Sequence, residues 1–340
     1  MTAIRGYVPA TNRPGLGVHS LDHFVLAVPD LAPAQRFYSD FGLDVQAAGD
    51  ALGLKTAGHD QHWGMVVEGK RKKLHHLSFG CYSDDLPYLQ ERAEANGVAL
   101  VDPPKGFESN GFWFQDPAGL LIEIKVAAKV SPARKTPGTW SSSPEGVAGA
   151  PVRAKAPIVR PRRLSHVLVF TPDVDRSLAF YSNIVGLRLS DRSDRVAFMH
   201  AIHGSDHHIL AFAQSSGPGL HHCSWDMSGI DDIGLGAMHM AGKGYSEGWG
   251  LGRHVLGSNY FHYVRDPWTA MQSTPATSTT SRPSKTGRPA AIRPKTPSTC
   301  GAPSRRPTSR STASSRPCLL NWDQRQRQRR SVPFPVVARG

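Results

Sequence analysis

Hydrophobic and polar residues alternate along the first part of the chain in a way that predicts short strands and helices in a repeated order. Residues 21–28 form an apolar, β-branched run typical of a buried strand. Residues 32–41 place Ala34, Phe37 and Tyr38 on one helical face. A further helix and several strands are predicted at residues 63–67, 74–80, 84–95, 112 and 120–126. The order strand, helix, strands therefore occurs twice in tandem.

The second half of the chain repeats this pattern. The corresponding segments are residues 21–30 with 164–173, residues 37–39 with 180–182, and His75-His76 with His221-His222. The first two pairs share an offset of 143 residues. Two strand–helix–strands units in each half indicate an α+β fold of four such modules arranged in two domains.

Changes in composition predict where these domains begin and end. Residues 128–162 are rich in Pro, Ser, Gly, Lys and Arg, which is typical of a linker. After Trp268 the chain has almost no apolar periodicity, so it cannot bury enough surface to offset its ordering entropy. The predicted segments are a lead-in at 1–17, a first domain at 18–130, a linker at 131–162, a second domain at 163–268 and a disordered basic tail at 269–340.

The formal net charge of +13 lies entirely in that tail. Residues 269–340 hold 14 of the 40 Lys and Arg residues and only one acidic residue, Asp323. The remaining body is neutral, which argues against nucleic acid as a partner. The tail has no interleaved aromatic residues or amphipathic face, so it does not favour binding to nucleic acid or to a membrane.

The cysteine pattern and the hydropathy of the chain indicate its compartment. The four Cys residues show neither a zinc-knuckle spacing nor a disulfide framework. Residues 1–17 lack the apolar core of a secretory signal, and no run approaches the roughly 18 apolar residues of a membrane span. We therefore expect a reduced, cytoplasmic protein.

The first half contains a possible set of metal ligands. His23 lies on the opening strand of the first module, His76 on the opening strand of the second, and Glu123 on a closing strand. Paired strands can bring three such side chains to one face of a curved sheet. Two imidazoles and one carboxylate are the ligands of non-heme iron(II) oxygenases, which leave metal positions open for substrate and dioxygen.

The second half repeats this set incompletely. His166 and His222 correspond to the two histidine ligands. The carboxylate of the first half lies seven residues after the Asp of an Asp-Pro pair, and the same spacing in the second half leads to Ser273. The second set has therefore lost its third ligand.

The second half also carries groups for which we expect no counterpart in the first half. These are His208, in a His-His pair just before the fourth module, and His254 and Tyr263 beyond it. An acid–base His and a phenol beside a metal suit a reaction that deprotonates a phenolic substrate. These three residues could instead have purely structural roles, His254 on a surface loop and His208 and Tyr263 in packing.

These residues resemble the C-terminal domain of the extradiol ring-cleaving catechol dioxygenases. That family belongs to the vicinal oxygen chelate superfamily, with glyoxalase I and the bleomycin-resistance proteins. The resemblance covers residues 18–268, and its most specific segments are 164–172, 207–208, 220–222, 251–254 and 263–267. It implies four βαβββ modules paired into two domains of this superfamily.

The resemblance also implies a role for each candidate residue. His166 and His222 would bind iron(II), with manganese(II) as an alternative, and the family's Glu ligand falls on Ser273. His208 would be the acid–base residue, and His254 and Tyr263 would stabilise charge. The implied reaction is extradiol cleavage of a catechol with dioxygen in aromatic catabolism. The implied assembly is a homo-oligomer.

The N-terminal domain of two-domain extradiol enzymes is usually non-catalytic. The resemblance therefore implies that His23, His76 and Glu123 form at most a relic metal site.

One hypothesis for the missing Glu is that the chain after about residue 269 is read in a wrong frame. When the last base of one codon is joined to the first two of the next, the codons of Gln272 and Ser273 can encode Glu. The Arg, Pro, Ser and Thr bias of the tail is what an out-of-frame GC-rich gene produces. We therefore expect impaired activity in this chain.

Two other functions remain open from the residues. The chain could be a non-catalytic binding module of the same fold, although such a module does not need His208, His254 and Tyr263. It could also be a glyoxalase-like lyase or isomerase that uses zinc or nickel. The ligand sets of those enzymes normally contain more carboxylate, so the two-His pattern argues against this function.

Overall fold

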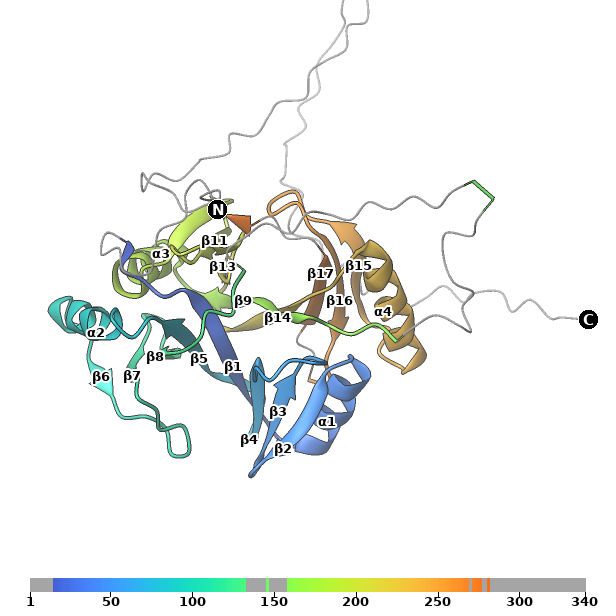
Figure 1. The fold of residues 1–340 in the computed structure, drawn as a ribbon, viewed down its shortest axis with the longest axis horizontal. Coiled ribbons are helices and arrows are strands. Elements are labelled where there is room, and N and C mark those ends of the chain that lie inside the picture. The colour runs from blue at the N-terminus through green and yellow to red at the C-terminus, as the bar shows by residue number, and fades with distance from the viewer. Residues whose placement is uncertain (1–14, 133–144, 147–157, 269–270, 277–279, 282–340) are drawn as a thin grey trace, which may run out of the picture. The chain divides into compact units, whose positions relative to one another are not determined.

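The computed structural model describes residues 15–132, 145–146, 158–268, 271–276 and 280–281, and for 271–276 and 280–281 it describes the backbone alone. These residues form two eight-stranded sheets, each with two helices beside it, as Figure 1 shows. The strand orders are β2-β3-β4-β1-β5-β8-β7-β6 and β10-β11-β13-β9-β14-β17-β16-β15. The two sheets therefore have the same topology, as the internal repeat predicts.

The first sheet and its helices cover residues 20–126. Its elements are β1 (Ser20–Val28), α1 (Leu31–Asp40), β2 (Asp44–Ala48), β3 (Ala51–Lys55), β4 (Gly64–Glu68), β5 (Lys73–Cys81), α2 (Leu86–Ala95), β6 (Leu100–Val101), β7 (Phe112–Gln115) and β8 (Leu121–Val126). Parallel pairing of β1 with β4 and of β5 with β8 closes each module, and antiparallel pairing of β1 with β5 joins the two modules.

The second sheet repeats this arrangement between residues 163 and 276. Its elements are β9 (Arg163–Thr171), α3 (Val174–Phe180) continued by a π-helical turn η3 (Tyr181–Val185), β10 (Arg188–Arg192), β11 (Val196–His200), β13 (Leu210–Gln214), β14 (Gly219–Asp226), α4 (Ile230–Gly242), β15 (Gly248–Arg253), β16 (Tyr260–Arg265) and β17 (Met271–Ala276). A separate two-stranded pair joins β12 (Ser205–Asp206) to β18 (Thr280–Ser281).

The local sequence explains where these elements begin. Asp30 precedes α1, and its carboxylate accepts a hydrogen bond from the Ala32 amide at 2.8 Å. Asp173 caps α3 in the same way, through the Arg176 amide at 2.9 Å. Such caps satisfy amides that have no partner within the helix. The helices and strands predicted from periodicity in the first half are confirmed, with ends within a few residues.

The prediction that the last module lacks its closing strand is wrong. β17 lies between β14 and β16 and completes the second sheet. Strand pairing uses main-chain groups, so the Ser, Thr and Pro content that predicted disorder does not prevent it. β14 pairs only with residues 271–273, so Pro275 lies where β17 has a partner on one side, a position that tolerates proline.

Several predicted segments lie outside the described residues. These are residues 1–14 of the lead-in, residues 133–144 and 147–157 of the linker, and the tail apart from the β17 and β18 backbone. Among the described helices, none is both long and apolar enough to cross a membrane.

The two sheets share one hydrophobic core, because modules from opposite halves pack together. In the first pairing, Phe37 of α1 contacts Tyr245, with ring centroids 5.0 Å apart. In the second, Phe114 of β7 contacts Phe180 of α3 at 5.8 Å. The first module therefore packs on the fourth and the second on the third. Each predicted set of metal ligands lies within one sheet and is shared by that sheet's own two modules.

Candidate metal centres

A β-bulge shapes each His-His pair. The β1–β5 register shifts between Val25 and Leu26, which leaves His75 without an opposite residue. The β9–β14 register shifts in the same way at His221. A bulge redirects side chains that would otherwise alternate between the two faces of the sheet. In both pairs the Nδ1 atoms of the neighbouring imidazoles consequently lie 2.8 Å apart.

The first sheet brings together the three predicted ligands of the first half. Donor atoms of His23, His76 and Glu123 all lie within 4.8 Å of one another. His76 and Glu123 are buried, and the His23 side chain is 12% exposed. Nε2 of His76 is buried and has no hydrogen-bond partner among the described residues.

Polar neighbours orient these three side chains. Asp22 lies at a second bulge of β1 and accepts a hydrogen bond from Nδ1 of His23 at 2.7 Å. Lys125 lies 3.1 Å from the same carboxylate. The Ser78 hydroxyl donates to Glu123. Metal-binding histidines usually donate their second ring N–H to such a carboxylate, which fixes the ring and leaves Nε2 for the metal.

The second sheet brings together the two predicted His ligands of the second half. Nε2 of His166 and Nε2 of His222 lie 3.2 Å apart, within hydrogen-bonding distance of each other. Ser165 takes the place of Asp22, with its hydroxyl 3.2 Å from Nδ1 of His166. The orienting group in this half is therefore neutral.

Strand pairing shows which residue replaces the carboxylate. In the first sheet, Ser78 of β5 is opposite Glu123 of β8, which is opposite Trp113 of β7. In the second sheet, Ser224 of β14 is opposite Ser273 of β17, which is opposite Tyr263 of β16. The backbone of Ser273 therefore occupies the position of Glu123, as the Asp-Pro spacing predicted.

The hydrogen bonding of Ser224 also differs from that of its counterpart Ser78. Ser78 donates its hydroxyl to Glu123, whereas the buried hydroxyl of Ser224 has no partner within the described part of the chain. A buried hydroxyl without a hydrogen bond costs about 1–3 kcal/mol. The position next to residue 273 is thus suited to donate to an acceptor.

The acid–base candidates of the second half surround its His pair. The ring of His208 lies 3.9 Å from that of His166, and the ring of Tyr263 lies 5.1 Å from that of His222. Nε2 of His254 is 3.1 Å from the Tyr263 hydroxyl. All five predicted residues of the second half therefore lie in one cluster.

A chain of hydrogen bonds leads from His208 towards the surface. Nδ1 of His208 lies 3.1 Å from Nδ1 of His207, and Nε2 of His207 lies 2.6 Å from the Asp191 carboxylate. His208 is 7% exposed, so these hydrogen bonds orient a buried imidazole.

Burial favours the neutral form of five imidazoles, one in the first half and four in the second. It lowers the pKa of His76 to about 2, with smaller contributions from His23, His75 and Lys125. It lowers the pKa of His254 to about 4. It also brings the pKa values of His166, His208 and His222 well below the ordinary value. A neutral imidazole is the form that binds a metal or accepts a proton.

The register also corrects the expectation that the first half has no counterpart of His208. Ile209 accepts the backbone hydrogen bond of Val167, and Trp63 accepts that of Phe24. His62, which precedes Trp63, is therefore the positional counterpart of His208. Unlike His208 it is exposed.

Sequence reasoning missed Asp22, Ser78, His62 and Trp113 as site residues. The sequence contained a signal for Ser78 and His62. The pattern His-x-Ser recurs at His76 and His222, and His62 precedes His208 by the same number of residues as His76 precedes His222. This offset is three residues longer than the 143 that relates the first segments, so the correspondence of His62 with His208 was overlooked.

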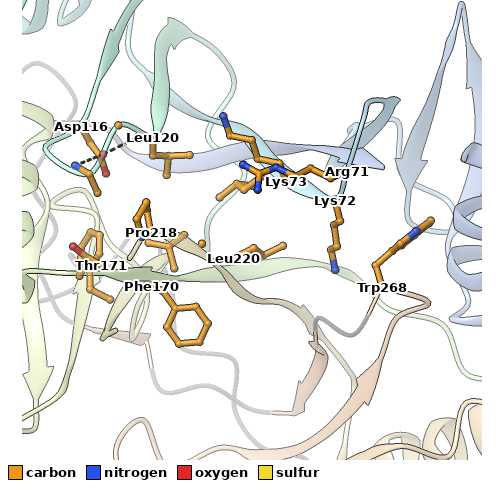
Figure 2. Close-up of a pocket in the computed structure, with 16 residues that line it drawn as sticks. Arg71, Lys72, Lys73, Asp116, Leu120, Phe170, Thr171, Pro218, Leu220 and Trp268 are labelled. Atoms are coloured by element: carbon orange, nitrogen blue, oxygen red, sulfur yellow. Dashed lines mark hydrogen bonds between the residues drawn. The ribbon is translucent and has the colours of Figure 1, made fainter. Parts of the chain in front are cut away.

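The structure also contains a pocket of about 570 Å³ at the junction of the two halves. Figure 2 shows Lys72 and Lys73 on one side and Phe170, Leu220 and Trp268 on the other. None of the predicted site residues lines it. Lys72 is paired with the Asp266 carboxylate. The pocket is therefore separate from the chemistry of both sites.

Comparison with known proteins agrees with this architecture. Residues 20–124 and 163–270 match the family model of the Glyoxalase/Bleomycin resistance protein/Dioxygenase superfamily, so the chain belongs to that superfamily. It is 50% identical over 266 residues to metapyrocatechase 2 of Cupriavidus necator, covering 78% of this chain and 82% of that protein. Within the superfamily, the chain belongs to the metapyrocatechase-like extradiol ring-cleaving dioxygenases.

More distant relatives share the same range. A biphenyl-2,3-diol 1,2-dioxygenase of Metapseudomonas furukawaii is 29% identical over 282 residues, covering 74% of this chain and 84% of the relative. Among solved structures, a 2,3-dioxygenase of Pseudomonas sp. KL28 has a TM-score of 0.65 at 19% identity, covering 82% of this chain and 98% of its own. A Mn(II)-bound glyoxalase of Novosphingobium aromaticivorans has a TM-score of 0.65 at 24% identity, covering 82% and 89%. These structures support the fold.

Proposed function

We propose that the second sheet carries an extradiol dioxygenase site that opens a catechol ring with dioxygen and is impaired in this chain. The observation that carries the proposal is the register of Ser224 and Ser273, which reproduces that of Ser78 and Glu123 without the carboxylate. His166 and His222 are the proposed ligands of iron(II), with manganese(II) as the alternative metal.

The donors present do not complete a set for that metal. Two imidazoles supply two of the three ligands, and each is within hydrogen-bonding distance of the other. A 2-His-1-carboxylate site also needs a negative charge to balance a divalent cation. Two neutral histidines alone should hold the metal weakly.

The other residues of the cluster suit proton transfer from a catechol. Buried, neutral His208 can accept a proton from a substrate hydroxyl, with Asp191 and His207 orienting its ring. Tyr263 and His254 lie within hydrogen-bonding distance of each other and can stabilise negative charge on the substrate. This division of roles is our proposal for the cluster, as is a homo-oligomeric assembly.

The cause that we propose is a reading-frame break near codon 269. The family match ends at residue 270, close to where the composition changes. Overlapping codons permit a Glu at position 273. Resequencing the gene and its transcript across codons 265–275 tests this cause. A reproducible, unbroken frame through Thr269 would show that the serine is genuine.

Restoring the carboxylate tests the function itself. We expect Ser273→Glu, and the frame-corrected chain, to raise catechol cleavage with added iron(II) by at least about 10²-fold. Loss of a neighbour that merely orients a ligand already costs 10–100-fold, so a direct ligand should cost more. Absorbance of the yellow ring-opened product measures the rate.

Ser273→Gln is the matched control, because it adds similar bulk without charge and should leave the rate low. Full activity of the unaltered chain would overturn the claim that position 273 matters. Failure of both repaired chains to cleave any catechol would overturn the proposed reaction.

A further inference from the structure

We infer that His23, His76 and Glu123 of the first sheet bind a divalent transition-metal ion, so that the metal centre of this chain lies in its N-terminal half. This inference does not depend on the function proposed for the second sheet. The three residues lie in the N-terminal domain, for which the resemblance implies no catalytic role.

The spacing of the three donors favours an ion between them. Their ligand atoms lie within 4.8 Å of one another, yet no hydrogen bond between any two of the three occurs in the described structure. In the second sheet, where the carboxylate is replaced, the two His Nε2 atoms approach to 3.2 Å. The ligand atoms of the first set therefore remain unbonded to one another, whereas the two imidazoles of the second set lie within hydrogen-bonding distance.

The remaining bonds of each donor leave one atom free for a metal. Nδ1 of His23 is occupied by Asp22, and Nδ1 of His76 by His75. One oxygen of Glu123 accepts from Ser78. Nε2 of His76 is left buried without a partner in the described chain. A cation would satisfy this nitrogen, whose burial otherwise costs about 1–3 kcal/mol.

A simple hydrogen-bonded cluster is the competing explanation. Such a cluster would pair the Glu123 carboxylate with one of the imidazoles, because an unpaired buried nitrogen is unfavourable. Instead, each of the three side chains bonds to a neighbour outside the set through an atom that the metal would not use. Metal ligands are usually oriented by such hydrogen bonds on the side away from the metal.

Trp113 provides a second, independent indication. It lies opposite Glu123 in the register, and its ring is 4.8 Å from that of His76. Its Nε1 is buried and has no acceptor among the described residues. Water, hydroxide or a small oxyanion on the metal would give this N–H an acceptor. A 2-His-1-carboxylate set leaves positions open for such ligands.

The donor set also defines the class of ion. Two imidazoles and a carboxylate with no thiolate suit Mn(II), Fe(II), Co(II) or Zn(II) and disfavour soft monovalent copper. His23 is the partly exposed ligand, so an ion can enter at its side of the site.

Metal titration of the full chain, stripped with a chelator, tests the inference. Calorimetry with Mn(II) and visible absorption with Co(II) both report binding without any enzymatic assay. We expect about one tight equivalent, lost in Glu123→Gln and His76→Gln. We expect it to persist in His222→Gln and in the matched control Glu94→Gln, which alters an exposed carboxylate of α2.

The outcomes separate the two sites. Retention of the tight equivalent in Glu123→Gln, or its loss in His222→Gln, would assign the metal to the second sheet and overturn the inference. The absence of any tight binding to the unaltered chain would also overturn it. Circular dichroism confirms that each variant is folded. If Ser273→Glu acquires a second equivalent, both sites bind metal; if it gains none, the function proposed above fails while the N-terminal site stands.

Discussion

The two halves of this chain have the same strands and the same register but have kept different parts of one chemical site. The first half retains all three predicted metal ligands, His23, His76 and Glu123. The second half retains the proposed acid–base group His208 and the proposed charge-stabilising pair His254 and Tyr263. The comparison shows that backbone pairing maintains a position after its side chain has changed. Metal binding and proton transfer can therefore be tested separately in one molecule.

The largest expected effect concerns proton transfer. In the Ser273→Glu background, His208→Gln should lower kcat by about 10²–10⁴-fold, because a positioned acid–base residue contributes this much. Metal content should not change, since His208 is not among the proposed ligands. Steady-state kinetics with iron(II), together with metal analysis of the same samples, measures both quantities.

His62→Gln is the matched variant in the other half. His62 occupies the same strand position as His208 but is exposed, so we expect kcat within about twofold of the Ser273→Glu background. If His208→Gln keeps full kcat, or if His62→Gln loses as much as His208→Gln, the proposed division between the halves is wrong.

A smaller effect is expected from the serines that border the carboxylate position. Ser78→Ala removes the donor to Glu123 and should weaken metal binding in the first half by about 10–100-fold. Ser224→Ala should have no such effect, because its hydroxyl has no described partner to lose. Calorimetric titration with Mn(II) compares the two affinities.

Ser78 and Ser224 should affect metal binding alike once a carboxylate is present at position 273. In the Ser273→Glu background, Ser224→Ala should weaken the second site as Ser78→Ala weakens the first. An unchanged affinity there would mean that residue 273 does not reach the hydroxyl of Ser224, despite their opposed register.

Periodicity and spacing predicted much of this molecule, and the remainder has physical reasons. The strand at residues 21–28 and the helix at 32–41 follow from residues that pack on one face. The position of Ser273 follows from a conserved spacing within the repeat, because five residues separate β7 from β8 and five separate β16 from β17. β17 was missed because its pairing depends on main-chain groups, which composition does not reveal.

The orienting groups were missed for another reason. Asp22 and His75 act through β-bulges, and a bulge is a property of two paired strands that one strand's sequence does not show. His62 is exposed although it corresponds in position to buried His208, and the spacing of residues does not predict this difference in burial.

The smallest effect is expected where the halves meet. Tyr181 and Tyr38 are equivalent in the repeat, and both are fully buried. The Tyr181 hydroxyl donates to Asp116 of the other half at 3.0 Å, whereas the Tyr38 hydroxyl has no partner among the described residues. Asp266, the equivalent of Asp116, is paired with Lys72.

Replacing each tyrosine by phenylalanine should therefore give unequal results. Tyr181→Phe should lower the free energy of unfolding by about 1–3 kcal/mol, because Asp116 loses a buried donor. Tyr38→Phe should be neutral or slightly stabilising, because it removes a hydroxyl that is buried without a bond. Urea denaturation of both variants measures the difference. Equal losses would mean that the two tyrosines make equivalent bonds and that the halves are joined more symmetrically than their hydrogen bonds indicate.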